Sequence, residues 1–329
     1  MTSLIGNAPV DGVDVAALLG IPISAEQERA VQAPLKPCAV IAGAGTGKTT
    51  VMAARVVWLV ASRLVSPEEI LGLTFTNKAT AELSERIESN LTRVGLLTSE
   101  QPRPTVATYD SFAGTLVNDY GAWDGISTGA HLITGARAYQ LAAEVVMGLD
   151  KAPLAATHMG PTFIAQAVVK LAGAMASHDA SPGKVRRADA RWRQMLLAAP
   201  TKRGGDRYAD IDKWLSRVDE REELLDLVAA YQNLKKERGL VEFGDRMVQA
   251  LHLVTHHPRV GEELRARYRV VLLDEYQDTS SAQADVLAAL FSGPDSAHGM
   301  GHPVMAVGDP LQAIYEWRGA AASNILEFH

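Results

Sequence analysis

The chain has 329 residues, of which 47% are hydrophobic, and a formal net charge of −6. This length accommodates two domains, or one domain with a large insertion, and the composition supports a substantial core. The acidic balance argues against a protein that coats nucleic acid nonspecifically, because such proteins are usually basic over their binding surface. It leaves room for a local basic track.

The sequence also predicts the compartment. Cys38 is the single cysteine and can form no intrachain disulfide, which is typical of the reducing cytoplasm. No uninterrupted apolar run of about eighteen residues is present, and the first residues lack the basic start and apolar core of a signal peptide. We therefore expect a soluble cytoplasmic protein with no membrane partner.

Two short helices are the first predicted elements. Residues 14–19 fit a helix that Gly20 closes. A second helix begins after Ser24, which can cap it, and Gln27 occupies the reciprocal position of a capping box. The spacing favours this capping role for Gln27. The alternative is that its carboxamide, which presents a donor and an acceptor side by side, recognises the edge of adenine.

A glycine-rich turn comes next, between a short apolar strand at 38–41 and an apolar helical pattern that starts at Thr50. The turn consists of Ala42, Gly43, Ala44, Gly45, Thr46, Gly47, Lys48 and Thr49. Its glycines allow successive N–H groups to point at phosphate oxygens, and the helix N-terminus adds partial positive charge. Lys48 is expected to reach the β- and γ-phosphates of ATP, and Thr49 to bind Mg²⁺. The alternative is a turn that merely connects strand and helix, and Ala42 stands where the strict pattern has glycine.

Strands and helices alternate after this turn and again near the end of the chain. Strands are predicted at 69–76, 105–109, 269–273 and 303–307, and helices at 77–90, 111–120 and 281–291. This alternation predicts an α/β fold in which a parallel sheet has helices on both faces.

The middle of the chain has a different pattern. Residues 132–254 are almost wholly helical in signature, and no convincing strand occurs there. The sheet elements before and after this region enclose it, so we interpret it as a helical insertion. The predicted division is 1–120 for the first part of the α/β domain, 121–240 for the insertion and 241–329 for the second part.

The insertion contains one basic stretch, residues 184–207. Its charged side chains are the basic Lys184, Arg186, Arg187, Arg191, Arg193, Lys202, Arg203 and Arg207 and the acidic Asp189 and Asp206. The commoner interpretation of such a stretch is a solvated helix face. In an acidic chain, the alternative is a landing site for nucleic-acid phosphates.

Two adjacent carboxylates follow the apolar strand at 269–273. Asp274 is expected to hold Mg²⁺, usually through water, and Glu275 to accept a proton from an attacking water. An ordinary exposed turn could also contain such a pair. Active sites, however, collect at the carboxyl edge of parallel sheets, where these residues and the glycine-rich turn would meet.

Four motifs in order resemble those of the UvrD/PcrA/Rep and RecB group of superfamily 1 DNA helicases. They are AGAGTGKT at 42–49, LTFTNKAT at 73–80, DEYQDT at 274–279 and VGDPLQAIYEWRGA at 307–320. The similarity extends from about Ile23 to the end of the chain and is weakest across the helical insertion. Its start, including MAARVVWLVASRL at 52–64, looks closest to actinobacterial AdnAB-type helicase-nuclease subunits.

The resemblance implies a RecA-like motor domain with ATP and Mg²⁺ as cofactors. It implies catalytic roles for Lys48, Glu275 and Gln312, the last as sensor of the γ-phosphate, and it reverses the preference above by making Gln27 the adenine-reading glutamine. The implied partners are single-stranded DNA, its junctions with duplex, and a second helicase-nuclease subunit. The residues implied to contact DNA are Phe75, Thr76, Asn77, Tyr315, Trp317 and Arg318. Aromatic faces stack on any base for roughly 1–3 kcal/mol, although without the resemblance Tyr315 and Trp317 would be expected in the core.

Three positions depart from the family pattern. Thr50, directly after the glycine-rich turn, replaces the usual arginine and removes one nucleotide contact. Asp110, in the segment TYDSF, stands where histidine is usual, and a carboxylate there would repel DNA phosphates. Residues 241–245 follow only loosely the acidic segment that returns the chain to the sheet.

The function implied is ATP-dependent 3′ to 5′ DNA translocation and unwinding in repair or recombination. The chain ends at His329, just after the last motif, so we expect an N-terminal portion that lacks a second RecA-like domain and hydrolyses ATP very slowly alone. One alternative is a non-hydrolysing DNA-binding or scaffold subunit of a heterodimeric helicase-nuclease. The presence of Lys48, Asp274, Glu275 and Gln312 argues against it. Another is a P-loop kinase for a small metabolite, which leaves the last motif and the insertion without a purpose.

Overall fold

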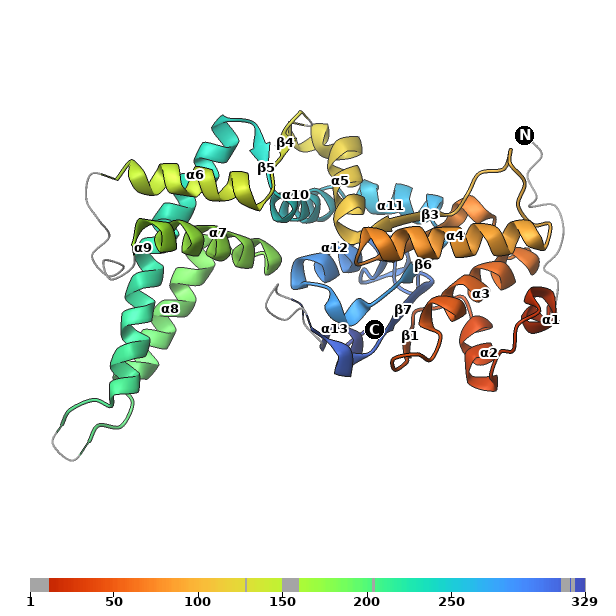
Figure 1. Ribbon diagram of the computed structural model, residues 1–329, viewed down its shortest axis with the longest axis horizontal. Coiled ribbons are helices and arrows are strands. Elements are labelled where there is room, and N and C mark those ends of the chain that lie inside the picture. The colour runs from red at the N-terminus through yellow and green to blue at the C-terminus, as the bar shows by residue number, and fades with distance from the viewer. Residues whose placement is uncertain are drawn as a thin grey trace. The chain divides into compact units, whose positions relative to one another are not determined.

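The computed structural model describes residues 12–127, 129–149, 160–202, 205–314, 320 and 323–328. The chain divides into two compact units: unit 1 comprises Met1–Asp124 and Gln249–His329, and unit 2 is Gly125–Val248 (Figure 1). Two crossings therefore connect the units, as expected for an insertion. No helix within the described ranges combines the length and apolar character that crossing a bilayer requires.

Unit 1 is built on a five-stranded sheet in which every strand pairing is parallel. The strands, in spatial order, are β1 (Cys38–Ile41), β7 (Val304–Gly308), β6 (Val270–Leu273), β2 (Ile70–Thr74) and β3 (Thr105–Thr108). Strands β1 and β6 lie far apart in sequence, yet each pairs with β7, so their carboxyl ends meet at one edge of the sheet. This edge is where a parallel sheet presents its ligand site.

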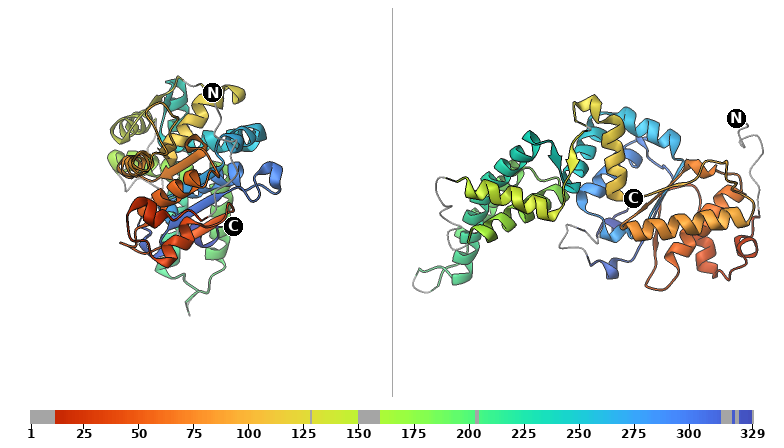
Figure 2. Two further views of the ribbon diagram at one scale, coloured as in Figure 1. Left: turned by 90° about the vertical axis from the view of Figure 1, so that its right-hand side faces the viewer. Right: turned by 45° about the horizontal axis from the view of Figure 1, so that its top comes forward.

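Helices cover both faces of this sheet (Figures 1 and 2). The helices of unit 1 are α1 (Val15–Leu19), α2 (Ala25–Val31), α3 (Lys48–Ala61), α4 (Asn77–Arg93), α5 (Tyr109–Tyr120), α11 (Pro258–Arg267), α12 (Ser281–Phe291) and α13 (Ser323–Leu326), and α10 (Phe243–His256) joins the units. Helices α1 to α4 share one hydrophobic core with alternating strand residues such as Ile70, Val270 and Met305. The intervening strand residues, such as Leu71 and Val271, are buried outside that cluster. Burial on both faces explains why these strands are continuous apolar runs.

Arg55 secures the end of α2 against α3. Its guanidinium is 1% exposed and donates hydrogen bonds to the carbonyls of Ala30, Val31, Ala33 and Pro34 at 2.8–3.4 Å. These carbonyls belong to the last turn of α2 and the segment after it, where those of Val31 and Ala33 accept no other hydrogen bond from a residue the structure describes. The arginine thereby fixes the helix that carries Gln27 to the helix that begins at Lys48.

The described residues of unit 2 form helices and one pair of short strands. Its helices are α6 (Gly135–Met147), α7 (Pro161–Ser177), α8 (Pro182–Leu197) and α9 (Ala209–Glu237). Helices α6, α7 and α9 bury a shared core that includes Leu141, Val168 and Tyr231. Two strands of two residues, β4 (His131–Leu132) and β5 (Leu240–Val241), pair in parallel beside it.

A buried lysine fixes the end of unit 2. Lys235 on α9 is 1% exposed, and its ammonium lies 2.7 Å from Glu242 and 2.6 Å from Asp245. The hydroxyl of Tyr231 donates to the same Glu242 carboxylate at 2.8 Å. Residues 241–245, which follow the family's acidic segment only loosely, therefore supply the two carboxylates that neutralise the buried Lys235.

The α/β prediction is confirmed, as are the strand Cys38–Ile41 and the helix Ser281–Phe291. The expectation that the insertion contains no strand is wrong, because β4 and β5 lie there. Two-residue strands are too short to show alternation, so their pairing leaves no sequence signal. The predicted boundaries at 120 and 240 compare with divisions after 124 and 248.

Candidate active site

The phosphate loop, residues 42–49, joins β1 to α3. Gly45 and Gly47 adopt positive φ angles of 74° and 83°, which only glycine reaches without strain. The loop is closed internally by the Thr46 hydroxyl, which donates to the carbonyl of Gly43 at 2.8 Å. Helix α3 then begins with no side-chain cap and no acidic residue in its first turn. Its free N–H groups and its dipole are therefore available to an anion.

Gln27 contacts this loop directly. Its carbonyl oxygen accepts the N–H of Ser24 at 2.9 Å, and the capping box of α2 is complete, as the spacing predicts. Its amide nitrogen donates to the carbonyl of Thr46, also at 2.9 Å. A Cβ on Gly47 would lie 3.2 Å from the same nitrogen. Gln27 thus caps α2 and lies against the loop at once, and recognition of adenine by its remaining hydrogen-bonding capacity stays a prediction.

Arg86 on α4 also reaches the start of α3. Its guanidinium donates to the hydroxyl of Thr50 at 2.8 Å. The position directly after the phosphate loop is therefore next to an arginine after all, one supplied by another helix. Sequence spacing gave no sign of this residue, because the contact depends on how α4 packs against α3.

Lys48 and Glu275 meet across the carboxyl edge of the sheet. The Lys48 ammonium lies 3.1 Å from Oε2 of Glu275, and the two side chains are 11% and 35% exposed. Glu275 has φ 46° and ψ 45°, a left-handed conformation that costs a non-glycine residue about 1 kcal/mol. That turn directs consecutive carboxylates of Asp274 and Glu275 to different positions, as their separate predicted roles require.

Asp274 is the more buried of the two carboxylates, at 5% exposure. Burial, together with the neighbouring negative charge of Glu275, raises its pKa from the usual 3.8 to about 6. Its Oδ1 atom accepts the N–H of Glu275 at 3.1 Å, and Oδ2 makes no hydrogen bond with any residue the structure describes. The buried hydroxyl of Tyr109 donates to the Asp274 carbonyl at 2.9 Å and holds the backbone there.

These residues fit a magnesium ion. Mg²⁺ takes hard oxygen ligands, keeps several waters and usually binds one or two carboxylates together with substrate phosphates. The Asp274 oxygen without a hydrogen bond and the Thr49 hydroxyl are donors of this type. Among the described residues, no group of three or more histidines, cysteines and carboxylates could hold a metal ion. A site that takes its other ligands from ATP and water needs no such group.

Gln312 lies on the turn that follows β7, in η6 (Pro310–Gln312). Its amide nitrogen donates to the carboxylate of Asp309, which lowers the pKa of that carboxyl, as does the N–H of Leu311. A Cβ on Gly43 would lie 3.9 Å from the same Asp309 carboxylate. The Gln312 turn is thereby placed beside the phosphate loop.

Gln277, which the sequence analysis did not single out, connects this turn with Glu275. It is 1% exposed, and its amide nitrogen donates to Glu275 at 2.9 Å and to Asp278 at 3.2 Å. Its carbonyl oxygen accepts the N–H of Asp309 at 3.0 Å. Only the position of Gln277 within DEYQDT could have drawn attention to it, since nothing in the local pattern predicts these distant contacts.

The residues expected to contact DNA are only partly described. Thr76 and Asn77 are exposed at the carboxyl end of β2, where Thr76 caps α4, and Phe75 beside them is half-buried. Tyr315, Trp317 and Arg318 lie outside the described residues. Contact of either group with DNA therefore stays a prediction.

Asp110, the departure from the family's histidine, has a partner in the protein. The Gln283 amide on α12 donates to its carboxylate at 2.9 Å. This contact links the first turn of α5 to the helix that follows DEYQDT. It gives the carboxylate a structural role consistent with the expectation that it does not bind phosphate.

Four described basic residues of the stretch 184–207 form ion pairs within unit 2. Its ion pairs are Lys184 with Asp179, Arg186 with Glu222 and Asp226, Arg193 with Asp219, and Arg207 with Asp212. Asp189 on α8 pairs in turn with Arg221 on α9. These pairs support the interpretation of a charged helix face, in which Arg186, Arg193 and Asp189 hold α8 to α9, and a landing site for phosphates stays a prediction.

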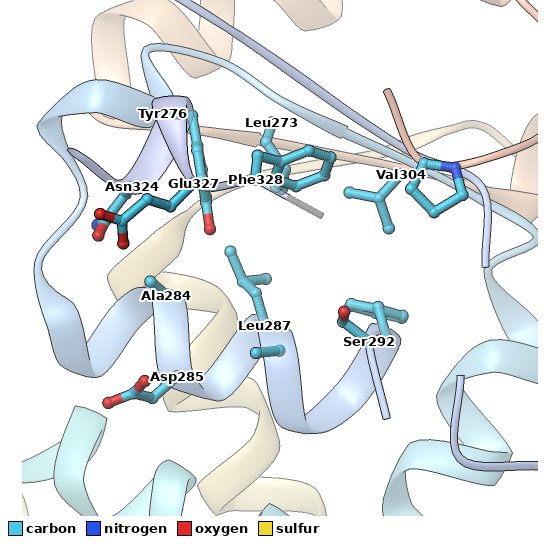
Figure 3. Close-up of a pocket in the computed structure, with 13 residues that line it drawn as sticks. Leu273, Tyr276, Ala284, Asp285, Leu287, Ser292, Val304, Asn324, Glu327 and Phe328 are labelled. Atoms are coloured by element: carbon cyan, nitrogen blue, oxygen red, sulfur yellow. The ribbon is translucent and has the colours of Figure 1, made fainter. Parts of the chain in front are cut away.

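A cavity of about 270 Å³ lies beside α12 and η4 (Tyr276–Asp278). Figure 3 shows Tyr276, Leu287 and Phe328 around it, and the rings of Tyr276 and Phe328 meet edge to face at 5.6 Å. The phosphate loop contributes none of its lining residues. Tyr276, the residue after Glu275, lines this cavity, which is separate from the phosphate loop.

Comparison with known proteins agrees with this geometry. The chain is 28% identical over 309 residues to DNA helicase II of Rickettsia typhi and over 311 residues to ATP-dependent DNA helicase UvrD1 of Mycobacterium tuberculosis. It is 30% identical over 317 residues to DNA helicase II of Haemophilus influenzae. These alignments cover 93–96% of this chain and 35–40% of the relatives, so the chain spans well under half their length. The UvrD/REP helicase N-terminal domain matches residues 23–329, and the chain belongs to that family.

Proposed function

We propose that this chain is the ATP-hydrolysing part of a DNA helicase that moves 3′ to 5′ along single-stranded DNA and acts in repair or recombination. The observation that carries the proposal is the contact between Lys48 and Glu275 at the uncapped N-terminus of α3. A lysine for phosphates and a carboxylate for water lie side by side there, at the ligand edge of a parallel sheet.

The side chains divide the work as follows. The α3 N-terminus and Lys48 bind the phosphates, and Gln27 and Arg86 line the loop on the side of α2 and α4. Mg²⁺, held by Thr49 and Asp274, would neutralise phosphate charge when bound. Glu275 shares its Oε2 atom with Lys48 and Gln277, while its Oε1 atom makes no hydrogen bond with a described residue. Oε1 is the atom that orients the attacking water and takes its proton.

DNA binding is proposed for Phe75, Thr76, Asn77, Tyr315, Trp317 and Arg318. Exposure of Thr76 and Asn77 at the same sheet edge supports it, because their strand β2 is the direct neighbour of β6, which leads into Asp274. A strand of DNA held there would be linked to the hydrolytic carboxylates through the sheet itself.

An active motor is favoured over a non-hydrolysing scaffold subunit. Such a subunit would not need Lys48 and Glu275 in contact, nor a buried carboxylate such as Asp274 that costs stability when ionised. Association with a second helicase-nuclease subunit rests only on the resemblance of residues 52–64, and co-purification from the source cells would test it.

The test is strand displacement by the full-length protein. A duplex with a 3′ single-stranded tail should be unwound when ATP and Mg²⁺ are present, and an otherwise identical duplex with a 5′ tail should not. Lys48→Ala should abolish unwinding, whereas Arg103→Ala, which removes an arginine paired with Glu88 on α4, should leave it intact. Displacement of neither substrate by wild-type protein that still hydrolyses ATP would reject the helicase assignment and leave a DNA-bound ATPase.

A further inference from the structure

An unbroken chain of polar contacts crosses the site from Gln312 to Lys48. The Gln312 amide binds the Asp309 carboxylate, and the Asp309 N–H binds the Gln277 carbonyl at 3.0 Å. The Gln277 amide nitrogen binds Glu275 at 2.9 Å, and Glu275 binds Lys48 at 3.1 Å. Among these contacts, Gln277 is the residue that joins the turn after β7 to the Glu275 carboxylate.

The orientation of the Gln277 amide is set by its surroundings. Its nitrogen faces two carboxylate oxygens, of Glu275 and Asp278, and its oxygen faces an N–H group. A rotated amide would place its oxygen against both carboxylates and its nitrogen against the N–H of Asp309, so all three contacts would become repulsive. At 1% exposure, no water compensates for such a loss. The amide therefore cannot turn independently of the groups on either side.

Gly308 permits this close approach. A Cβ at that position would lie 2.1 Å from Oε1 of Gln277 and 2.9 Å from a methyl group of Ile325. Ile325 is buried, so neither side has room to yield. The backbone of β7 and the Gln277 amide are thus fitted together where the turn to Gln312 begins.

We propose that Gln277 is a positioning residue that transmits the state of the 309–312 turn to Glu275. When that turn shifts against the nucleotide, the Asp309 N–H moves the Gln277 amide, and the amide moves the Glu275 carboxylate relative to Lys48. The Glu275 carboxylate is held by two contacts of its Oε2 atom, one with Lys48 and one with Gln277, so a shift of either partner changes its position. This inference rests on the proposed function, in which Glu275 orients the attacking water.

Two substitutions at this position separate the two contacts. Gln277→Met has a similar length and removes all three hydrogen bonds. Gln277→Glu keeps an oxygen for the Asp309 N–H but loses the donor to Glu275. In the full-length protein with saturating single-stranded DNA, both should lower kcat for ATP by about 100- to 1,000-fold, within the range that positioned general bases contribute. The dissociation constant for a fluorescent ATP analogue should stay within about threefold of wild type, because no phosphate contact is lost.

The matched control is Gln283→Met, a glutamine of the same segment whose amide contacts Ser280 and Asp110 instead. It should leave kcat within about threefold. Gly308→Ala displaces the Gln277 amide without changing it and should reproduce the loss of kcat. If Gln277 has only a structural role, its substitutions should lower the melting temperature, but Gln277→Glu, which keeps an acceptor for the Asp309 N–H, should retain normal kcat. That result would overturn the proposal.

A double-mutant cycle with Gln312→Met tests transmission itself. If both glutamines act along one path, the double variant with Gln277→Met should be about as slow as the slower single variant. If instead the fold-losses in kcat of the two single variants multiply in the double variant, the two glutamines act independently, and transmission through Gln277 is rejected. The role of Gln277 and the proposed function are tested by different variants. The proposed function requires that Glu275→Gln abolish turnover, whatever the Gln277 variants do.

Discussion

Replacing Asp274 with asparagine should stabilise the protein in the absence of nucleotide and Mg²⁺. Burial raises the pKa of this carboxyl from 3.8 to about 6, so the folded protein binds its proton more tightly than the unfolded chain does. Such a group costs stability at high pH, where ionisation of the buried carboxyl is forced, and costs nothing well below pH 3.8. The shift of the pKa from 3.8 to about 6 corresponds to a cost of about 3 kcal/mol at pH 8 and about 2 kcal/mol at pH 5. Asp274→Asn removes this cost.

The assay is urea unfolding of wild type and Asp274→Asn at both pH values, without Mg²⁺. The gain in free energy of unfolding should be larger at pH 8 than at pH 5 by about 1 kcal/mol. Asp309→Asn is the control of opposite sign, because hydrogen bonds from Gln312 and Leu311 lower the pKa of Asp309, and that variant should be less stable above pH 4. A loss of stability in Asp274→Asn at pH 8, or a gain that does not change with pH, would show that burial does not raise the pKa of Asp274.

Three further substitutions test the packing around the site. Gly47→Ala should weaken ATP binding by about tenfold, measured with a fluorescent analogue, because an L-residue at φ 83° is strained and its Cβ meets Gln27. Arg55→Met should lower the free energy of unfolding by about 2–4 kcal/mol, since it leaves the carbonyls of Val31 and Ala33 without donors, against less than about 1 kcal/mol for the exposed Arg103→Met. Lys235→Met should destabilise unit 2 by about 3–5 kcal/mol in thermal melts, because two carboxylates lose their buried cation.

Each of these outcomes has a clear opposite. Unchanged nucleotide affinity in Gly47→Ala would mean that the loop rearranges on binding. Equal effects of Arg55→Met and Arg103→Met would mean that water satisfies the α2 carbonyls. A Lys235→Met protein as stable as wild type would mean that Glu242 and Asp245 reach solvent when the lysine is removed.

The sheet was predictable from sequence because its strands are continuous apolar runs that end in polar motifs. Burial on both faces produces that pattern, and the strand at Cys38–Ile41 has the predicted bounds. The capping box of Ser24 and Gln27 was predictable for a similar reason, since both contacts lie within one helical turn. Features whose physical cause is local can be inferred from local sequence.

The contacts that shape the site are not local. Arg86 reaches Thr50 because α4 packs on α3, and Gln277 reaches Asp309 because β6 and β7 are neighbours. The basic stretch 184–207 is a second example. Its acidic partners on α9, such as Asp219 and Glu222, lie outside this stretch in sequence, so its local charge did not predict the ion pairs. The order of the motifs in the sequence predicted which residues form the site. The contacts that each of them makes depend on tertiary packing.

ATP turnover by Glu275→Gln is the measurement that tests the account most directly. The full-length variant should bind a fluorescent ATP analogue within about threefold of wild-type affinity, because Lys48 and the phosphate loop are intact. Its kcat with saturating single-stranded DNA should fall by at least about 100-fold, because glutamine cannot take the proton of the attacking water. Turnover within about threefold of wild type would contradict the assignment of Glu275, and with it the view that the contact between Lys48 and Glu275 marks a hydrolytic site.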